Sequence, residues 1–115
     1  RFSGIGQPVL VPGDMGTASW VLAGPKAGKN DAFSSSCHGA GRSLSRTAAR
    51  KTINPEELAM SLESEGVHVR SKTPRLLVEE APEAYKDVDE VIRLTSEANL
   101  ARPVARLRPL AVIKG

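Results

Sequence analysis

The chain has 115 residues, of which 40% are hydrophobic, 25% charged and only 3% aromatic, which is the composition of one modest soluble domain with an aliphatic core. Its net charge of +3 is compatible with a polyanionic partner but is too small to indicate one. The single cysteine, Cys37, excludes an intramolecular disulfide framework and any zinc site that needs paired cysteines, and no apolar run is long enough to span a bilayer. We therefore expect a cytoplasmic protein without a membrane segment. The opening Arg1–Gly4, which lacks a methionine, favours a piece of a longer chain.

Two short strands are predicted near the start of the chain. Val9–Val11 is an apolar run closed by the turn Pro12-Gly13-Asp14, and Thr17–Ala23 is rich in residues that favour strands. The next residues, 24–30, combine a proline, two glycines and two lysines, a composition that favours an exposed loop. We expect two strands joined by a tight glycine-containing turn.

A glycine-rich turn that opens a helix is predicted next. Three serines at 34–36 lead into His38-Gly39-Ala40-Gly41, and Arg42–Lys51 then has helix-forming composition. The inward face of that helix is expected to carry Leu44, Ala48 and Ala49.

The clearest helix start is Asn54-Pro55-Glu56-Glu57. It offers a side-chain cap, a proline at the first helical position and a glutamate at the third, and Gly66 is the expected stop. Leu58 and Leu62 then face inward. Beyond this helix, Val67–Arg70 predicts a brief strand.

A second brief strand is predicted at Arg75–Val78, after a turn at Thr73-Pro74, so that the two strands form a hairpin or a bend. Because side chains alternate along a strand, His68 is expected on the polar face, opposite its neighbours Val67 and Val69.

The last predicted elements are a helix and a strand. Asp87-Val88-Asp89-Glu90 signals a helix with acids in its first turn, which ends near Leu100, ahead of Pro103. Its expected buried side consists of Val88, Val91, Ile92 and either Leu94 or Thr95. Val104–Ile113 predicts a strand, broken at Pro109. The expected fold class is α+β, with mixed short strands and two to three helices in a single module.

The run His38–Arg42 has the residues of a phosphate site. Gly39 and Gly41 lack a Cβ, so their N–H groups can approach an anion closely, and the helix that follows directs its positive end to the same point. A neutral imidazole at His38 can attack phosphorus and form a phosphoramidate. Arginines recur every fourth residue along this helix, at Arg42, Arg46 and Arg50, and such a face can follow a nucleic-acid backbone.

Plainer structural interpretations compete with this chemistry. A histidine beside glycines can be an ordinary turn residue, and arginines four apart can form a solvated helix face; the pattern alone favours both. The run Pro12–Thr17 can wrap a ribose or a phosphate, but closing a hairpin is the plainer interpretation. His68 is expected to be structural or exposed rather than a ligand.

Taken in order, these motifs resemble the RtcB family of RNA ligases. The resemblance includes VLVPGDMGTASWVL at 9–22, SCHGAGR at 36–42, EEAPEAYKDVD at 79–89 and RLRPLAVIKG at 106–115, with Ser45-Arg46 between the second and third runs. It covers nearly the whole chain. It implies that residues 1–115 are the C-terminal part of an RtcB-like ligase domain, within a larger single-domain enzyme, and contain the guanylate-carrying histidine and guanine-binding segments.

The resemblance implies an enzyme of tRNA splicing and RNA repair that uses GTP and manganese. Such an enzyme joins RNA ending in a 2′,3′-cyclic phosphate or a 3′-phosphate to RNA beginning with a 5′-hydroxyl. His38 is then the catalytic residue: it attacks the α-phosphorus of GTP, expels pyrophosphate and passes the guanylate to the RNA 3′-phosphate. The 5′-hydroxyl attacks this activated end and releases GMP. Metal ions neutralise the phosphate charge during these steps.

The resemblance also implies a set of nucleotide-binding residues, namely Pro12, Gly13, Asp14, Met15, Ser19, His38, Gly39, Ala40, Gly41, Tyr85 and Lys114. Among them Tyr85 closes over the guanine, and the Lys114 ammonium donates to guanine O6. Arg42 and Arg46 are the candidates for the RNA 3′-phosphate.

The family's manganese ligands, an Asp, a Cys and several His residues, are expected upstream of this chain, so no metal ligand is expected within it and the isolated 115 residues are expected to be inactive. An accessory activator protein is a further partner that the resemblance admits. Two alternatives remain: a non-catalytic fragment that binds a nucleotide or RNA, and a purely structural role.

Overall fold

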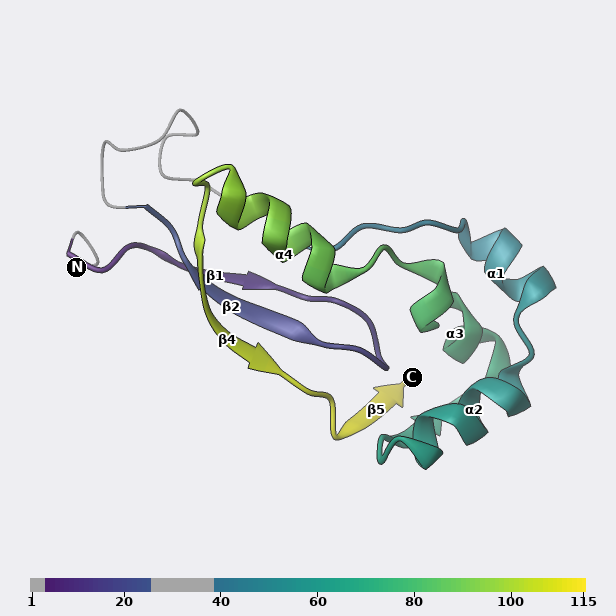
Figure 1. The fold of residues 1–115 in the computed structure, drawn as a ribbon. Helices are drawn as coiled ribbons and strands as arrows, with labels where there is room; N and C mark the ends of the chain where they lie inside the picture. Colours follow the sequence, from purple (N-terminus) through teal and green to yellow (C-terminus); the bar gives the residue numbers. More distant parts are fainter. Residues whose placement is uncertain (1–3, 26–38) are drawn as a thin grey trace. The chain divides into compact units, whose positions relative to one another are not determined.

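The structure, a computed structural model, describes residues 4–25 and 39–115, and the chain divides into two compact units. Unit 1 comprises the described residues of 1–13, 18–40 and 87–107, and unit 2 comprises residues 14–17, 41–86 and 108–115. The elements run in the order β1, β2, α1, α2, β3, α3, the short 3₁₀ helix η1, α4, β4 and β5 (Figure 1).

Unit 1 is an antiparallel sheet with one helix. β1 (Pro8–Val11) pairs with β2 (Ser19–Ala23), and β2 pairs with β4 (Arg102–Leu107), so the strand order is β1-β2-β4. α4 (Val88–Glu97) starts at Asp87, whose side chain accepts a hydrogen bond from the Asp89 N–H. The buried core of the unit consists of Val11, Ala18, Leu22, Ala40, Val88, Ile92 and Ala101.

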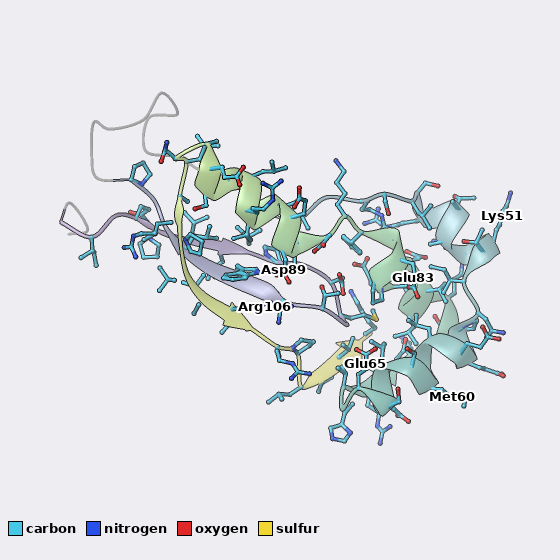
Figure 2. All side chains as sticks on the ribbon, in the orientation of Figure 1. Lys51, Met60, Glu65, Glu83, Asp89 and Arg106 are labelled. Carbon is cyan, nitrogen blue, oxygen red and sulfur yellow. The ribbon has the colours of Figure 1, made fainter. Side chains whose placement is uncertain are left out.

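A carboxylate on α4 connects the helix to one face of this sheet. Trp20 and Arg106 are register partners on β2 and β4, so their side chains share a face. The Trp20 Nε1–H donates to Asp89 Oδ1 over 2.7 Å, and Arg106 Nη2 lies 2.9 Å from Asp89 Oδ2. Figure 2 shows Asp89 and Arg106 facing each other from the helix and the strand. The contact fixes the side of the sheet that α4 covers.

Unit 2 combines helices with a small parallel sheet. Its elements are α1 (Arg46–Thr52), α2 (Pro55–Ser64), β3 (His68–Ser71), α3 (Pro74–Glu79), η1 (Pro82–Ala84) and β5 (Ala111–Lys114). β3 pairs in parallel with β5, so the last strand of the sequence lies beside a strand from the middle of the chain. The buried core consists of Met15, Leu58, Leu62, Val67, Val69, Leu77, Val78 and Ala81.

Local sequence signals explain where the helices of unit 2 begin. The Ser45 side chain accepts a hydrogen bond from the Ala48 N–H at the start of α1. Asn54 accepts from the N–H groups of Glu56 and Glu57 and Pro55 occupies the first turn, which confirms the predicted start of α2. α2 is followed by a left-handed residue, since Gly66 has a φ of +83°, where a side chain would be strained.

Most predicted elements are confirmed, but the helix predicted at Arg42–Lys51 begins only at Arg46, and Arg42 lies before it on an isolated β-bridge. Both early strands form, and the predicted strand at Val104–Ile113 is broken into β4 and β5 around Pro109. Val67 and Val69 are buried whereas His68 is exposed, as the alternation requires. On α4, Thr95 takes the buried position with 5% exposure, while Leu94 is 52% exposed.

The predicted strand at Arg75–Val78 is wrong. These residues lie within the helix α3, and β3 pairs with β5 rather than with them in a hairpin. Pro74 at the first helical position, after an extended Thr73, starts the helix, and it buries Leu77 and Val78 in the core of unit 2. A four-residue segment with three apolar residues is too short for its periodicity to separate strand from helix, so packing decides between them. The described residues consequently hold four α-helices rather than two to three.

Within residues 4–25 and 39–115, no helix has the length and apolar character required to cross a membrane.

Candidate functional site

A short antiparallel bridge joins the glycine-rich segment to the segment around Tyr85. Arg42 pairs with Tyr85, and the Lys86 N–H donates to the Gly41 carbonyl over 2.9 Å. The N–H groups of Ser43 and Leu44 both donate to the Ala84 carbonyl. These bonds fix two segments, separated by about forty residues in the sequence, at one place in unit 2.

The side chains of Arg42 and Tyr85 meet on this bridge. The guanidinium carbon lies 4.8 Å from the centroid of the ring, within range of a cation–π contact, and Nη1 donates to the phenol oxygen over 3.0 Å. Nε donates to the Leu44 carbonyl over 3.0 Å. Nη2 is buried and has no partner within the described part of the chain. A buried, charge-assisted donor without an acceptor is costly.

Glu80 connects this pair to the end of the chain. The Tyr85 hydroxyl donates to Glu80 Oε2, Arg42 Nη1 lies 3.9 Å from Oε1, and Lys114 Nζ lies 3.9 Å from Oε2. We call Arg42, Glu80, Tyr85 and Lys114 the Glu80 cluster. It brings together three residues that the family resemblance assigned to guanine or RNA phosphate.

The environment keeps Tyr85 protonated. Burial raises the pKa of the phenol above its ordinary value of 10.0, the hydrogen bond to the Glu80 carboxylate and its negative charge raise it further, and Arg42 opposes them. At neutral pH the hydroxyl is therefore a hydrogen-bond donor. Glu80 was not singled out from the sequence, although it lies in the matched run at 79–89; no local pattern distinguishes it from the other glutamates around it.

The arginines of α1 contact a different carboxylate. Glu79 is 7% exposed, and Arg50 binds it through Nε, over 2.5 Å, and through Nη2. Arg46 Nε lies 3.6 Å from the other oxygen of Glu79, with its own side chain 66% exposed. Arg46 and Arg50 do share a side of α1, as their spacing predicts, but that side faces a carboxylate rather than open solvent alone.

In unit 1, backbone hydrogen bonds hold several predicted nucleotide-binding residues. The Ala40 N–H donates to the Pro12 carbonyl over 3.1 Å, and the Gly13 N–H approaches Ser19 Oγ at 3.4 Å. Gly39 has a φ of +91°, a backbone conformation that favours glycine, and no atom of the described residues lies within 4 Å of a Cβ built there. The predicted contacts of these residues with a nucleotide stay predictions.

Asp14 and Met15, which lie in unit 2, are engaged within the protein. Asp14 Oδ1 accepts from the N–H groups of Gly16 and Thr17, and Oδ2 accepts from the Thr17 hydroxyl over 2.7 Å. This is an Asx turn, which shapes the loop. Met15 is 7% exposed and packs in the core, so only its backbone is available to a nucleotide. Their predicted binding role also stays a prediction.

Two residues of the matched motif, Cys37 and His38, lie outside the described residues. Among the residues that are described, there is no group of three or more His, Cys, Asp or Glu side chains that could hold a metal ion. The described side chains therefore do not fit a manganese site.

Comparison with known proteins places the chain in a family. A family model described as tRNA-splicing ligase RtcB matches residues 1–115. The chain is 49% identical over 114 residues to a tRNA-splicing ligase RtcB of Methanopyrus kandleri, which covers 99% of this chain and 12% of that protein. It is 50% identical to the tRNA-splicing ligase RtcB of Pyrococcus abyssi and 51% identical to that of Thermococcus kodakarensis, each over 111 residues and 96% of this chain.

The chain spans only part of these relatives, 12% of the Pyrococcus abyssi protein and 23% of the Thermococcus kodakarensis protein. The matched part nevertheless includes every residue of the Glu80 cluster and of the glycine-rich segment. Because the family model covers the whole sequence and about half of the residues are identical in each of these relatives, the chain belongs to the tRNA-splicing ligase RtcB family.

Proposed function

We propose that this chain is the guanylate-carrying part of an RNA ligase that uses GTP to join RNA ends. The ends are a 2′,3′-cyclic phosphate or 3′-phosphate on one strand and a 5′-hydroxyl on the other, and tRNA splicing or RNA repair supplies them. The observation that carries the proposal is the Glu80 cluster, in which Arg42, Tyr85 and Lys114 converge from distant parts of the sequence. The unpartnered Nη2 of Arg42 supports the binding of an anionic oxygen there.

In the proposed reaction His38 is the nucleophile. Its neutral imidazole nitrogen forms a bond to the α-phosphorus of GTP as the bond to pyrophosphate breaks. Where the RNA ends in a 2′,3′-cyclic phosphate, water first breaks the bond between phosphorus and the 2′-oxygen, which leaves a 3′-phosphate and a 2′-hydroxyl. The guanylate then moves from nitrogen to an oxygen of the RNA 3′-phosphate, which frees His38. The 5′-hydroxyl of the second strand attacks the phosphorus of that activated end, and GMP leaves with the bonding electrons. One phosphodiester forms, and one GTP becomes GMP and pyrophosphate.

The cluster has two roles in this proposal. The Lys114 ammonium, 3.9 Å from Glu80, is free to turn toward O6 of guanine, an oxygen that adenine lacks. The protonated Tyr85 phenol closes over the base, and Arg42 takes a phosphate oxygen. Manganese, when bound, would neutralise phosphate charge, and we propose that its ligands lie upstream of this chain.

The test is covalent labelling with GTP carrying a radioactive α-phosphate. The full-length protein that carries this sequence, incubated with manganese, is expected to acquire one acid-labile guanylate, because a phosphoramidate hydrolyses in acid. His38→Ala should abolish the label, whereas His68→Ala, a change at an exposed histidine of β3, should retain it. Labelling that persists in His38→Ala would refute the assignment of the nucleophile. GTP binding without labelling of the unmodified protein would favour a non-catalytic nucleotide-binding role.

A further inference from the structure

A second positively charged feature of unit 2 lies beside α1, apart from the Glu80 cluster. It is a pocket of about 450 Å³, within the range of about 300 to 1,000 Å³ that small-molecule sites occupy. Its floor is apolar and consists of Ile53, Val78 and the prolines at 55 and 74. Three cations line it: Arg50, Lys51 and Arg75. Of the residues that the structure describes, no acidic side chain lines it, so the pocket combines an apolar floor with positive charge.

The local sequence explains why these groups converge. Arg50 and Lys51 occupy the last turn of α1, and Arg75 and Val78 lie one turn apart on α3. Pro55 starts α2 and Pro74 starts α3, so neither proline leaves a helical N–H unsatisfied at the pocket's edge. Lys51 is exposed and extends from the outer end of α1 (Figure 2).

The charges in the pocket are not balanced within the unit. Glu79 binds Arg50 and so neutralises one of the three cations. Neither Lys51 nor Arg75 forms an ion pair within residues 4–25 and 39–115. The sequence from Gly39 to Pro55 contains four Arg or Lys residues and no Asp or Glu, and Lys51 is the one of the four for which the described residues supply no carboxylate. Two cations therefore remain available to an anionic ligand.

We propose that this pocket holds a nucleotide of the single-stranded RNA whose end is joined, with its phosphate between Lys51 and Arg75 and its base or ribose against the apolar floor. The inference rests on the proposed function, which makes RNA the substrate. An RNA strand fits both properties, since each nucleotide joins a flat, weakly polar base to an anionic phosphate. An acidic peptide would match the charge but would leave the floor uncovered. Because the floor has no aromatic ring and offers few polar groups, the pocket accepts any base.

The test compares two variants with the same loss of charge in the full-length protein that carries this sequence. Lys51→Gln with Arg75→Gln removes both free cations from the pocket. Arg70→Gln with Arg108→Gln removes two exposed cations from unit 2 that do not line it. Binding of a labelled single strand of about twelve nucleotides with a 3′-phosphate is measured by fluorescence anisotropy at several salt concentrations. Circular dichroism establishes that both variants remain folded.

The pocket variant is expected to bind the strand about tenfold more weakly at moderate salt. The slope of log affinity against log salt should become shallower by about 0.7, since the pocket is proposed to neutralise one phosphate and each phosphate contact with a single strand contributes about 0.7. The control variant should change neither quantity by more than about twofold. Labelling of His38 with GTP should persist in both variants, since neither touches the proposed nucleotide residues.

Other outcomes would overturn the inference. Equal weakening of RNA binding in both variants would show a diffuse electrostatic effect. Unchanged binding in the pocket variant would show that the strand lies elsewhere. Either result would refute the pocket as an RNA site and leave the proposed ligase function untouched. Polyglutamate is also tested as a competitor of the labelled strand. If it competes more strongly than unlabelled RNA, and if the pocket variant weakens its binding, the pocket binds an acidic protein partner instead of RNA. If the unmodified protein neither binds nor joins RNA, the proposed function itself fails.

Discussion

Tyr85 is the only tyrosine in the chain, so its ionisation can be followed without interference. Its hydroxyl donates to Glu80 and accepts from Arg42, and burial adds to the effect of the carboxylate in raising its pKa. The folded state therefore holds this proton more tightly than the unfolded state does. The stability that this provides is present in full below the ordinary pKa of 10.0 and declines as the pH rises above it.

We expect the near-ultraviolet absorbance of tyrosinate to appear above pH 10 in the folded protein. Glu80→Gln removes the carboxylate that raises the pKa, so the transition should move to lower pH, while the neutral amide still fills the same space. A titration followed by absorbance measures this directly. An unchanged or higher transition in Glu80→Gln would show that Glu80 does not act on the phenol.

Base preference is a second property that depends on one residue. If Lys114 donates to guanine O6, Lys114→Met should weaken labelling by GTP about tenfold to a hundredfold, the effect of losing one charged hydrogen bond. ATP lacks that oxygen, so any labelling by ATP should change little. The ratio of labelling by GTP and by ATP is the measurement, and a proportional loss with both nucleotides would contradict the role of Lys114 in choosing the base.

At the scale of elements, the Asp89 carboxylate adds polar contacts to the apolar packing of α4 against its sheet. Arg106 and then the Trp20 indole lower the pKa of Asp89, so the folded state binds a proton there less readily than the unfolded state. This contribution is present at neutral pH and declines as the pH falls through the lowered pKa. Because the ion pair is exposed, its contribution is small, within about 1 kcal/mol.

Asp89→Asn should therefore reduce the loss of stability in acid. Trp20 is the only tryptophan and contacts Asp89 itself, so its fluorescence reports unit 1. The measurement is urea unfolding at neutral and acidic pH, followed by that fluorescence. Glu97→Gln, on the same helix and away from the sheet, is the control and should leave the pH dependence almost as it was.

The elements also show which parts of the fold can be predicted from the sequence. α2 and α4 were predictable because their caps and apolar spacing are local signals. α3 was not predictable, since the sequence of Arg75–Val78 favours strand and helix equally and only the packing of Leu77 and Val78 in the core decides for a helix. The pairing of β3 with β5 joins residues some forty positions apart, and no local pattern encodes it. Within the site, Arg42, Tyr85 and Lys114 came from the family motifs, while Glu80 became distinct only through its contacts.

Across the whole molecule, both units have a core, and both expose large apolar side chains. In unit 1 the paired residues Leu10, Val21 and Ala105 share the face of the sheet that α4 does not cover, and Leu10 is 66% exposed. In unit 2, Ile113 on β5 is 83% exposed, while its neighbour Val112 packs against the core. Exposed apolar side chains of this kind promote association.

The isolated 115 residues are accordingly expected to self-associate with rising concentration. Ile113→Thr should reduce this association and change the free energy of unfolding by no more than about 0.5 kcal/mol, as an exposed site allows. Val112→Thr, one position earlier, should instead cost about 1 kcal/mol or more, because it places a hydroxyl against the core. Sedimentation velocity and urea unfolding measure the two effects. Similar losses of stability in both variants would contradict the arrangement in which Val112 packs against the core and Ile113 faces solvent.

The adjacent carboxylates at the end of α3 have a consequence for how the family's sequences can vary. Glu79 forms ion pairs with Arg46 and Arg50, and Glu80 forms ion pairs with Arg42 and Lys114. Two consecutive carboxylates therefore bind two separate pairs of cations. One residue inserted into α3 or removed from it would rotate both carboxylates by about 100° around the helix axis. Each would then face the wrong cations. The length of α3 is thus set by charge as well as by packing, and substitutions are tolerated there more readily than insertions or deletions.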